Sequence, residues 1–170
     1  MKRAAPGILL LLMTACGYHV GGRSDLMPKS IKTIAIPSFG NTTSRQKLPV
    51  MLGNAVTREF ISRTRYSVVA DPAQADAVLS GAVINYASYP TVLDPNTNRA
   101  TAVQAMVTVQ LTLTDRQTGK TLWSQPSVEF RERYEIASDP QAYFDESDTA
   151  MQRLSRDVAR RIVSAILTQF

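Results

Sequence analysis

The sequence of 170 residues contains one cysteine, Cys16, and one histidine, His19, two residue types used for nucleophilic attack, proton transfer and metal binding. A single cysteine cannot form an internal disulfide, and no group of His and Cys has the spacing of a metal site. His19 lies in the flexible, glycine-rich segment 17–22, without a nearby serine or cysteine nucleophile held in a strained turn. Neither a Gly-rich phosphate loop nor a Gly-x-Ser-x-Gly motif is present. We therefore expect a protein that is not an enzyme and has no metal or cofactor.

Cys16 stands at the end of a segment built like a secretory signal. A basic pair at positions 2–3 is followed by the apolar run 8–13 and by small residues directly before the cysteine. That run is much shorter than the ~20 residues of a membrane-spanning helix. Small residues before a cysteine resemble the lipobox of bacterial lipoproteins, so we expect cleavage of residues 1–15 and acylation of Cys16. A plain signal peptide with a stray cysteine is the alternative, but a free thiol would be a liability in an oxidising compartment.

The residues after Cys16 indicate where the protein would be sorted. Gly17, rather than Asp, follows the cysteine, which in lipoproteins of this kind suggests the outer membrane. Residues 16–28 are expected to form a flexible tether, and residues 29–170 a single domain. We therefore expect a lipid-anchored protein on the periplasmic side of the outer membrane, in contact with outer-membrane lipid through Cys16.

The composition is that of an ordinary globular protein, with 44% hydrophobic and 19% charged residues. There are 19 Lys and Arg against 14 Asp and Glu, a net charge of +5; removal of the basic pair at positions 2–3 leaves 17 against 14, or +3. No Lys/Arg cluster with interleaved aromatic residues is present, so nucleic acid is not an expected partner. The mild basicity suits an anionic lipid surface or a phosphorylated sugar.

The acidic residues that could do acid/base chemistry occupy positions where backbone capping explains them. They lie in turns or near the start of the last predicted helix, where carboxylates accept hydrogen bonds from free N–H groups. Capping is therefore preferred over catalysis for Asp115, Asp139, Asp145, Glu146 and Asp148.

Two groups of basic residues are candidates for binding. Arg153, Arg156 and Arg160 are three and four residues apart and form one stripe of the last helix, which is either a solvated face or a contact for an acidic partner or lipid phosphates. Arg99 and Lys120 each lie in a hairpin turn, where backbone sterics do not require a cation. If the hairpin ends form a binding site, Arg99 and Lys120 suit lipid phosphates.

Hydrophobic periodicity predicts two helices. The first covers residues 48–64, and the second follows Asp139 as N-cap and Pro140 as first helical residue, to about residue 170. The expected buried positions are Leu48, Leu52, Ala55, Val56 and Phe60 in the first helix and Met151, Leu154, Val158, Ile162 and Ala165 in the second.

Strands are predicted over residues 31–36, 66–69 and 77–89, with Gly81 as a candidate bulge. Residues 103–113 alternate most regularly, with the odd-numbered, apolar residues facing the core. A return strand covers 128–135, and turns are expected at 94–98 and 115–120. This order predicts an α+β two-layer sandwich, with two helices on one face of a mixed, mostly antiparallel sheet of about four strands.

This chain is similar to the LptE family, and the resemblance extends over nearly all of residues 16–170. The segments that carry it are Cys16-Gly17-Tyr18-His19, Ile34-Ala35-Ile36-Pro37 with Phe39 and Asn41-Thr42-Thr43, Thr57-Arg58-Glu59-Phe60-Ile61-Ser62-Arg63-Thr64, Ala75-Asp76-Ala77-Val78-Leu79-Ser80-Gly81 and Asp115-Arg116-Gln117-Thr118-Gly119-Lys120-Thr121-Leu122-Trp123. The resemblance implies two helices on a four-stranded sheet. It also implies a lipoprotein of lipopolysaccharide assembly that plugs the LptD β-barrel of the outer membrane, supports its assembly and binds lipopolysaccharide.

The resemblance also directs attention to basic residues near strand tips, which this family associates with lipopolysaccharide binding. Arg99 lies where the tip-loop arginine would be, and Lys120 is a second candidate. A further basic site expected before the last helix has no lysine here, since residues 136–139 are Ile-Ala-Ser-Asp.

An alternative resemblance covers the first half of the chain. Residues 34–39, 66–69 and 75–81 are also similar to the curli-secretion and penicillin-binding-protein-activator lipoproteins, which are oligomeric channel or regulator proteins. The long second hairpin favours LptE, whereas self-assembly into a ring would favour the alternative.

Overall fold

Three long antiparallel strands form the centre of the sheet: β4 (Ala77–Leu93), β5 (Ala100–Asp115) and β6 (Thr121–Glu135). The computed structural model describes residues 27–28, 30–136 and 140–169, and the side chains of 140–146 are outside this description. β5 lies between β4 and β6, and its apolar residues at odd positions 103–113 are all buried, as predicted. β6 begins at Thr121, earlier than predicted, and its Trp123 is buried opposite Leu113.

Three short strands complete the sheet along one half of β4. β1 (Thr33–Ala35) pairs in parallel with both β3 (Ser67–Val69) and β4, and β2 (Gly40–Asn41) pairs in parallel with β4 further along. The sheet therefore has six strands, and the prediction of about four was wrong. The strand that the sequence did not predict is β2, whose two residues are too few to show an alternating pattern. The mixed, mostly antiparallel character was predicted correctly.

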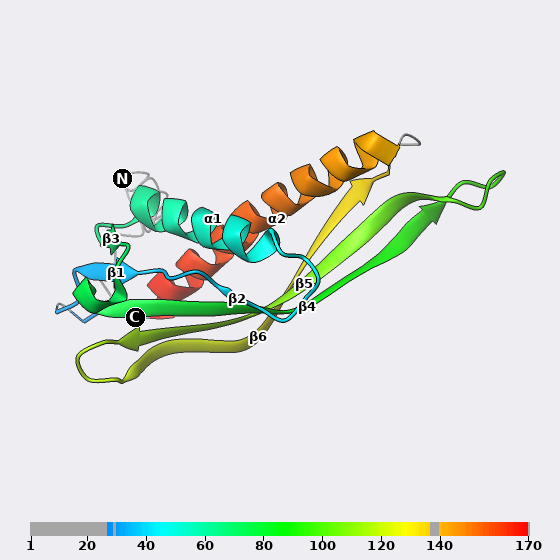
Figure 1. Cartoon of the computed structure of the whole chain (residues 1–170). Coiled ribbons are helices and arrows are strands. Elements are labelled where there is room, and N and C mark those ends of the chain that lie inside the picture. The colour runs from blue at the N-terminus through cyan, green and yellow to red at the C-terminus, as the bar shows by residue number, and fades with distance from the viewer. Residues whose placement is uncertain (1–26, 29, 137–139, 170) are drawn as a thin grey trace, which may run out of the picture.

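Both helices lie on the same face of the sheet (Figure 1). α1 (Leu48–Arg63) buries all five predicted positions, and α2 (Pro140–Gln169) buries four of its five, with Ala165 half-buried against the core. α1 ends where Thr64 donates from both N–H and Oγ1 to the carbonyl of Phe60. The two-layer arrangement of the prediction is confirmed. The helical turn η1 (Pro72–Gln74), capped by Asp71, connects β3 to β4.

Gly81 does not form the predicted bulge, because it pairs regularly with Leu111. The register of β4 against β5 shifts instead between Val83 and Asn85. An added Cβ at Gly81 would lie 2.9 Å from the ring of Phe39 and 3.0 Å from Cδ2 of Leu111. The absence of a side chain at position 81 therefore serves close packing of the Phe39 ring on the sheet.

Several predictions fall outside the described residues. The cleaved segment 1–15, the tether 16–28 apart from residues 27–28, Cys16, His19 and the N-cap Asp139 are among them. Within the described part, no helix combines the length and apolarity needed to cross a bilayer.

Candidate functional site

The two hairpin turns that carry the predicted cations have the same internal geometry. In the turn of residues 94–99, which we call the distal turn, Asp94 Oδ1 accepts hydrogen bonds from the N–H groups of Asn96 and Thr97, both at 2.8 Å. Asn98 has a φ of 54°, and the N–H of Asp94 donates to the carbonyl of Arg99. Arg99 therefore occupies the closing position of the turn, with its side chain exposed.

The turn of residues 115–120, the proximal turn, repeats each of these features. Asp115 Oδ1 accepts from Gln117 and Thr118, Gly119 has a φ of 69°, and Asp115 N–H donates to the carbonyl of Lys120. Lys120 is therefore the counterpart of Arg99. An aspartate at the first position and a residue with positive φ at the fifth explain why both sequences form the turn.

The distal turn, between β4 and β5, and the proximal turn, between β5 and β6, lie at opposite ends of the sheet (Figure 1), and so therefore do Arg99 and Lys120. β5 joins the two turns and has 16 residues, which span about 50 Å at ~3.3 Å per residue. No single phosphate group could reach both cations. If both bind an anionic ligand, they do so at two separate sites.

Among the described residues, hydrogen bonds to other parts of the fold are made by the proximal turn and not by the distal turn. Arg116 Nε donates to the carbonyl of Ala75 at 2.6 Å, and Arg116 N–H donates to the carbonyl of Asp76. The Asp76 carboxylate in turn accepts from the N–H groups of Lys32 and Thr33 and from Thr33 Oγ1. Through these hydrogen bonds the proximal turn connects the β5–β6 hairpin to the start of β4 and to β1.

These carboxylates have lowered pKa values for a common reason. The pKa of Asp94 is lowered chiefly by the Thr97 N–H, that of Asp115 by the Thr118 N–H and that of Asp76 by the Lys32 N–H. Backbone donors stabilise the charged form of the acceptor. For Asp115, capping is therefore confirmed as its role, and Asp148 forms an ion pair with Lys47 (2.9 Å). Asp139 lies outside the described residues, as do the side chains of Asp145 and Glu146.

The sheet face opposite the helices carries a group of residues that sequence reasoning did not identify. Tyr89 donates to Met106 Sδ at 3.3 Å, and Arg131 pairs with Glu129 at 2.6 Å. Glu129 is also the main cause of the raised pKa of Arg131, to which Tyr89 adds a smaller electrostatic contribution. The strand register places Arg133 on this face, beside Gln104. The alternation of the charged residues Glu129, Arg131 and Arg133 along β6 is the sequence pattern from which this group could have been predicted.

The arginine stripe of α2 divides into paired and unpaired members. Arg153 pairs with Glu132 of β6 at 3.0 Å, and Arg160 pairs with Asp157 on its own helix. Arg156 has no ion pair among the described residues. It lines a groove of 330 Å³ between α1 and α2, together with Ala55, Arg58, Glu59, Ser62, Ala159 and Arg160. The stripe is therefore more than a uniformly solvated face.

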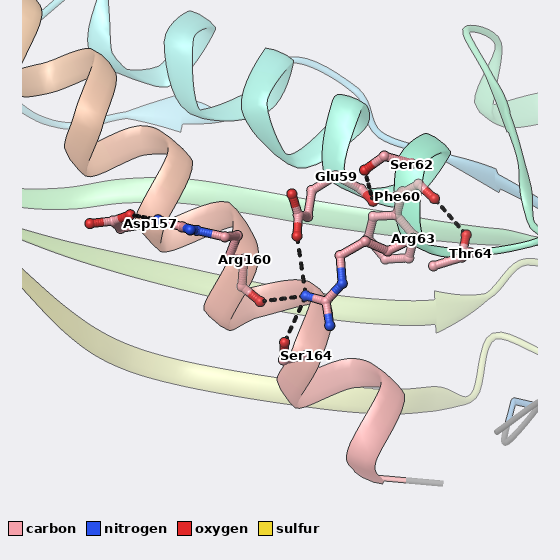
Figure 2. A network of polar contacts seen from close by, with 8 residues as sticks. All are labelled: Glu59, Phe60, Ser62, Arg63, Thr64, Asp157, Arg160 and Ser164. Carbon is pink, nitrogen blue, oxygen red and sulfur yellow. Dashed lines mark hydrogen bonds and ion pairs between the residues drawn. The ribbon is translucent and has the colours of Figure 1, made fainter. Parts of the chain in front are cut away.

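Arg63 fixes the two helices beside this groove (Figure 2). Its Nη1 donates to Glu59 Oε1 at 3.1 Å, to Ser164 Oγ at 2.9 Å and, at 3.5 Å, to the carbonyl of Arg160. The one carboxylate of the groove, Glu59, is thus already engaged. In the part of the chain that the structure describes, no group of His, Cys, Asp and Glu could hold a metal ion.

Comparison of the amino-acid sequence with protein-family models assigns this chain to a family. Residues 31–166, almost the whole described domain, match the model of the family described as LptE, lipopolysaccharide-assembly. The chain belongs to the LptE family. This is a family of non-enzymatic lipoproteins, and the match indicates no enzymatic family. The predicted family membership is therefore confirmed.

Solved structures share the fold of this LptE-family chain at low sequence identity. Rare lipoprotein B from Shewanella oneidensis is 17% identical, with a TM-score of 0.53, over 80% of this chain and 94% of that chain. Lipoprotein B from Nitrosomonas europaea is 13% identical, with a TM-score of 0.54, over 78% and 79%. The PelC dodecamer from Paraburkholderia phytofirmans is 18% identical, with a TM-score of 0.54, over 79% and 88%. These likenesses establish the fold alone. A comparison with curated protein sequences finds no match.

Proposed function

We propose that this LptE-family protein is anchored through acylated Cys16 on the periplasmic side of the outer membrane, occupies the LptD β-barrel as a plug and assembly partner, and binds lipopolysaccharide. The observation that carries this proposal is the family match over residues 31–166. It covers both helices and all the strands rather than an isolated motif. The domain limits 1–15, 16–28 and 29–170 are part of the same proposal.

The uncovered face of the sheet is the proposed contact with the barrel wall. Both helices lie on the other face, so β4, β5 and β6 present one side that no element of the described chain covers. That side mixes apolar side chains such as Met106 and Tyr89 with hydroxyl and amide groups such as Thr108 and Gln104. A surface of this mixed type suits a barrel lumen, which is polar.

The distal turn is the proposed contact with lipopolysaccharide. Arg99 is exposed and has no ion pair among the described residues, and exposed Val92 and Leu93 precede it at the end of β4. A guanidinium beside apolar side chains suits a phosphorylated lipid, because arginine binds phosphate through two hydrogen bonds. Lys120 lies at the other end of the sheet and would contribute only to a second, separate contact.

The test is affinity purification of the tagged, lipidated protein from outer membranes, with mass spectrometry of what remains after stringent detergent washing. The proposal predicts recovery of one large β-barrel in about equal amount, as a stable complex with a large interface would give. Replacement of Cys16 by Ser should remove the acyl modification from the mass of the mature chain. Recovery of a ring of identical chains, or of a peptidoglycan synthase, would instead support an oligomeric lipoprotein of the curli-secretion or penicillin-binding-protein-activator type.

A further inference from the structure

The groove between α1 and α2 contains more positive charge than the surrounding acids can neutralise. Three arginines line it, Arg58 from α1 and Arg156 and Arg160 from α2, against one carboxylate, Glu59. Arg160 is paired with Asp157, and Glu59 is paired with Arg63. Arg58 and Arg156 remain without an ion pair in the described part of the chain. With the partners Arg63 and Asp157 included, four arginines stand against two carboxylates, which leaves an excess of two positive charges.

The sequence of each helix explains why these two cations stay unpaired. No acidic residue stands three or four positions before or after Arg58 or Arg156. Arg156 instead has Arg153 three positions before it and Arg160 four positions after it, spacings at which like charges destabilise a helix. The row of arginines therefore costs stability, and nothing within the described fold offsets this cost at Arg156.

The packing of the two helices fixes the backbone positions from which Arg58 and Arg156 reach the groove. Ala55 and Ala159, both nearly fully buried, form the apolar part of the groove lining, and such small side chains let the helices approach closely. Arg63 of α1 is bonded to Ser164 of α2, as Figure 2 shows. Arg58 and Arg156 are thus held on opposite walls of one groove.

We propose that this groove binds a phosphate monoester group, held between Arg58 and Arg156 with Arg160 at its side. A phosphate monoester is close to a dianion at neutral pH and would neutralise both excess charges. The groove volume of 330 Å³ leaves room for a phosphate group together with several waters. A single carboxylate would neutralise only half of the charge. The proposal concerns the helical layer and does not rest on the lipopolysaccharide contact at the distal turn.

The experiment is calorimetric titration of the full lipidated chain, in neutral detergent micelles, with glycerol 2-phosphate. We expect saturable, millimolar binding that Arg58→Gln and Arg156→Gln each weaken about threefold to tenfold, as loss of one charge-assisted contact would give. Lys32→Gln removes one positive charge from the residue that precedes β1, outside the groove, and should change the affinity less than twofold. Circular dichroism of each variant checks that the fold is retained.

Two further arms identify the source of the phosphate and the competing ligand class. Micelles containing phosphatidic acid present the same group on a lipid. Binding that needs this lipid and both arginines would identify the ligand as a lipid headgroup. Binding of glycerol 2-phosphate as strong as that of the lipid would identify it as a soluble phosphoester. The proposal is overturned if neither form binds saturably, or if Arg58→Gln and Arg156→Gln bind like the wild type. Tighter binding of an oligoglutamate peptide than of phosphate, with the same arginine dependence, would also overturn it, because the groove would then recognise an acidic protein segment.

Discussion

The distal and proximal turns have the same backbone design but different surroundings. Each begins with an aspartate that accepts two backbone hydrogen bonds, has a positive φ at its fifth residue and ends with a cation. The proximal turn is fixed to the start of β4 by Arg116, whereas the distal turn, in the described chain, is bonded only within its own hairpin. The same local motif can therefore serve as a structural connection at one end of a sheet and as an exposed, cation-bearing tip at the other.

The largest expected effect is loss of the connection at the proximal turn. Arg116→Ala should lower the free energy of unfolding by about 2 kcal/mol, because a charged donor is removed from the carbonyl of the buried Ala75. Arg99→Ala at the distal turn should change it by less than about 0.5 kcal/mol, as for other exposed positions. Urea unfolding followed by circular dichroism measures both. Equal effects of the two substitutions would remove the distinction between the turns.

The next effect concerns binding rather than stability. Arg99→Glu should weaken lipopolysaccharide binding about tenfold, equivalent to ~1.4 kcal/mol, because attraction to phosphate becomes repulsion. Lys120→Glu, the same charge reversal at the other end of the sheet, should have a smaller effect. Binding of the two folded variants to immobilised lipopolysaccharide tests this. Unchanged affinity of Arg99→Glu would exclude Arg99 from the site, and a larger effect of Lys120→Glu would assign the contact to the proximal turn.

A smaller effect is expected at the residues with positive φ. Gly119→Ala should destabilise the protein by about 1 kcal/mol, because a side chain disfavours φ near 69°. Asn98→Gly should stabilise the distal turn by about 0.5 kcal/mol, since asparagine tolerates this region less well than glycine. Thermal unfolding of both variants gives the comparison. Gly119 has open space around its Cβ position, so a large loss of stability would have to come from the backbone.

The smallest effect is a pH dependence that both turns should share. The pKa values of Asp94 and Asp115 are lowered in the folded state, so their contribution to stability is present above the unfolded pKa and is lost as pH falls through the folded pKa. Asp115→Asn should therefore destabilise the protein at pH 7 and become indistinguishable from the wild type in strong acid. Urea midpoints at neutral and strongly acidic pH check the sign. A difference that grows in acid would contradict this explanation.

Much of the helical and long-strand structure could be predicted from the sequence, because it depends on local patterns. The helix from Leu48 needed only the spacing of its apolar residues, and the alternation of residues 103–113 correctly placed the core face of β5. The two-residue strand β2 forms only because β4 supplies a partner for it, and no local pattern encodes such pairing. The role of Gly81 could not be predicted for the same reason, because it depends on contact with the ring of Phe39, which lies 42 positions away in the sequence.

The candidate sites show the same division. The sequence by itself determined the LptE family, the lipobox-like segment before Cys16 and the presence of cations in both turns. Only the tertiary structure placed Arg99 and Lys120 at opposite ends of β5, bound Arg116 to Ala75 and brought Arg58 opposite Arg156 in one groove. Turn formation is governed by neighbouring residues, whereas charge complementarity depends on which distant residues the packed helices and strands bring within a few ångströms of each other.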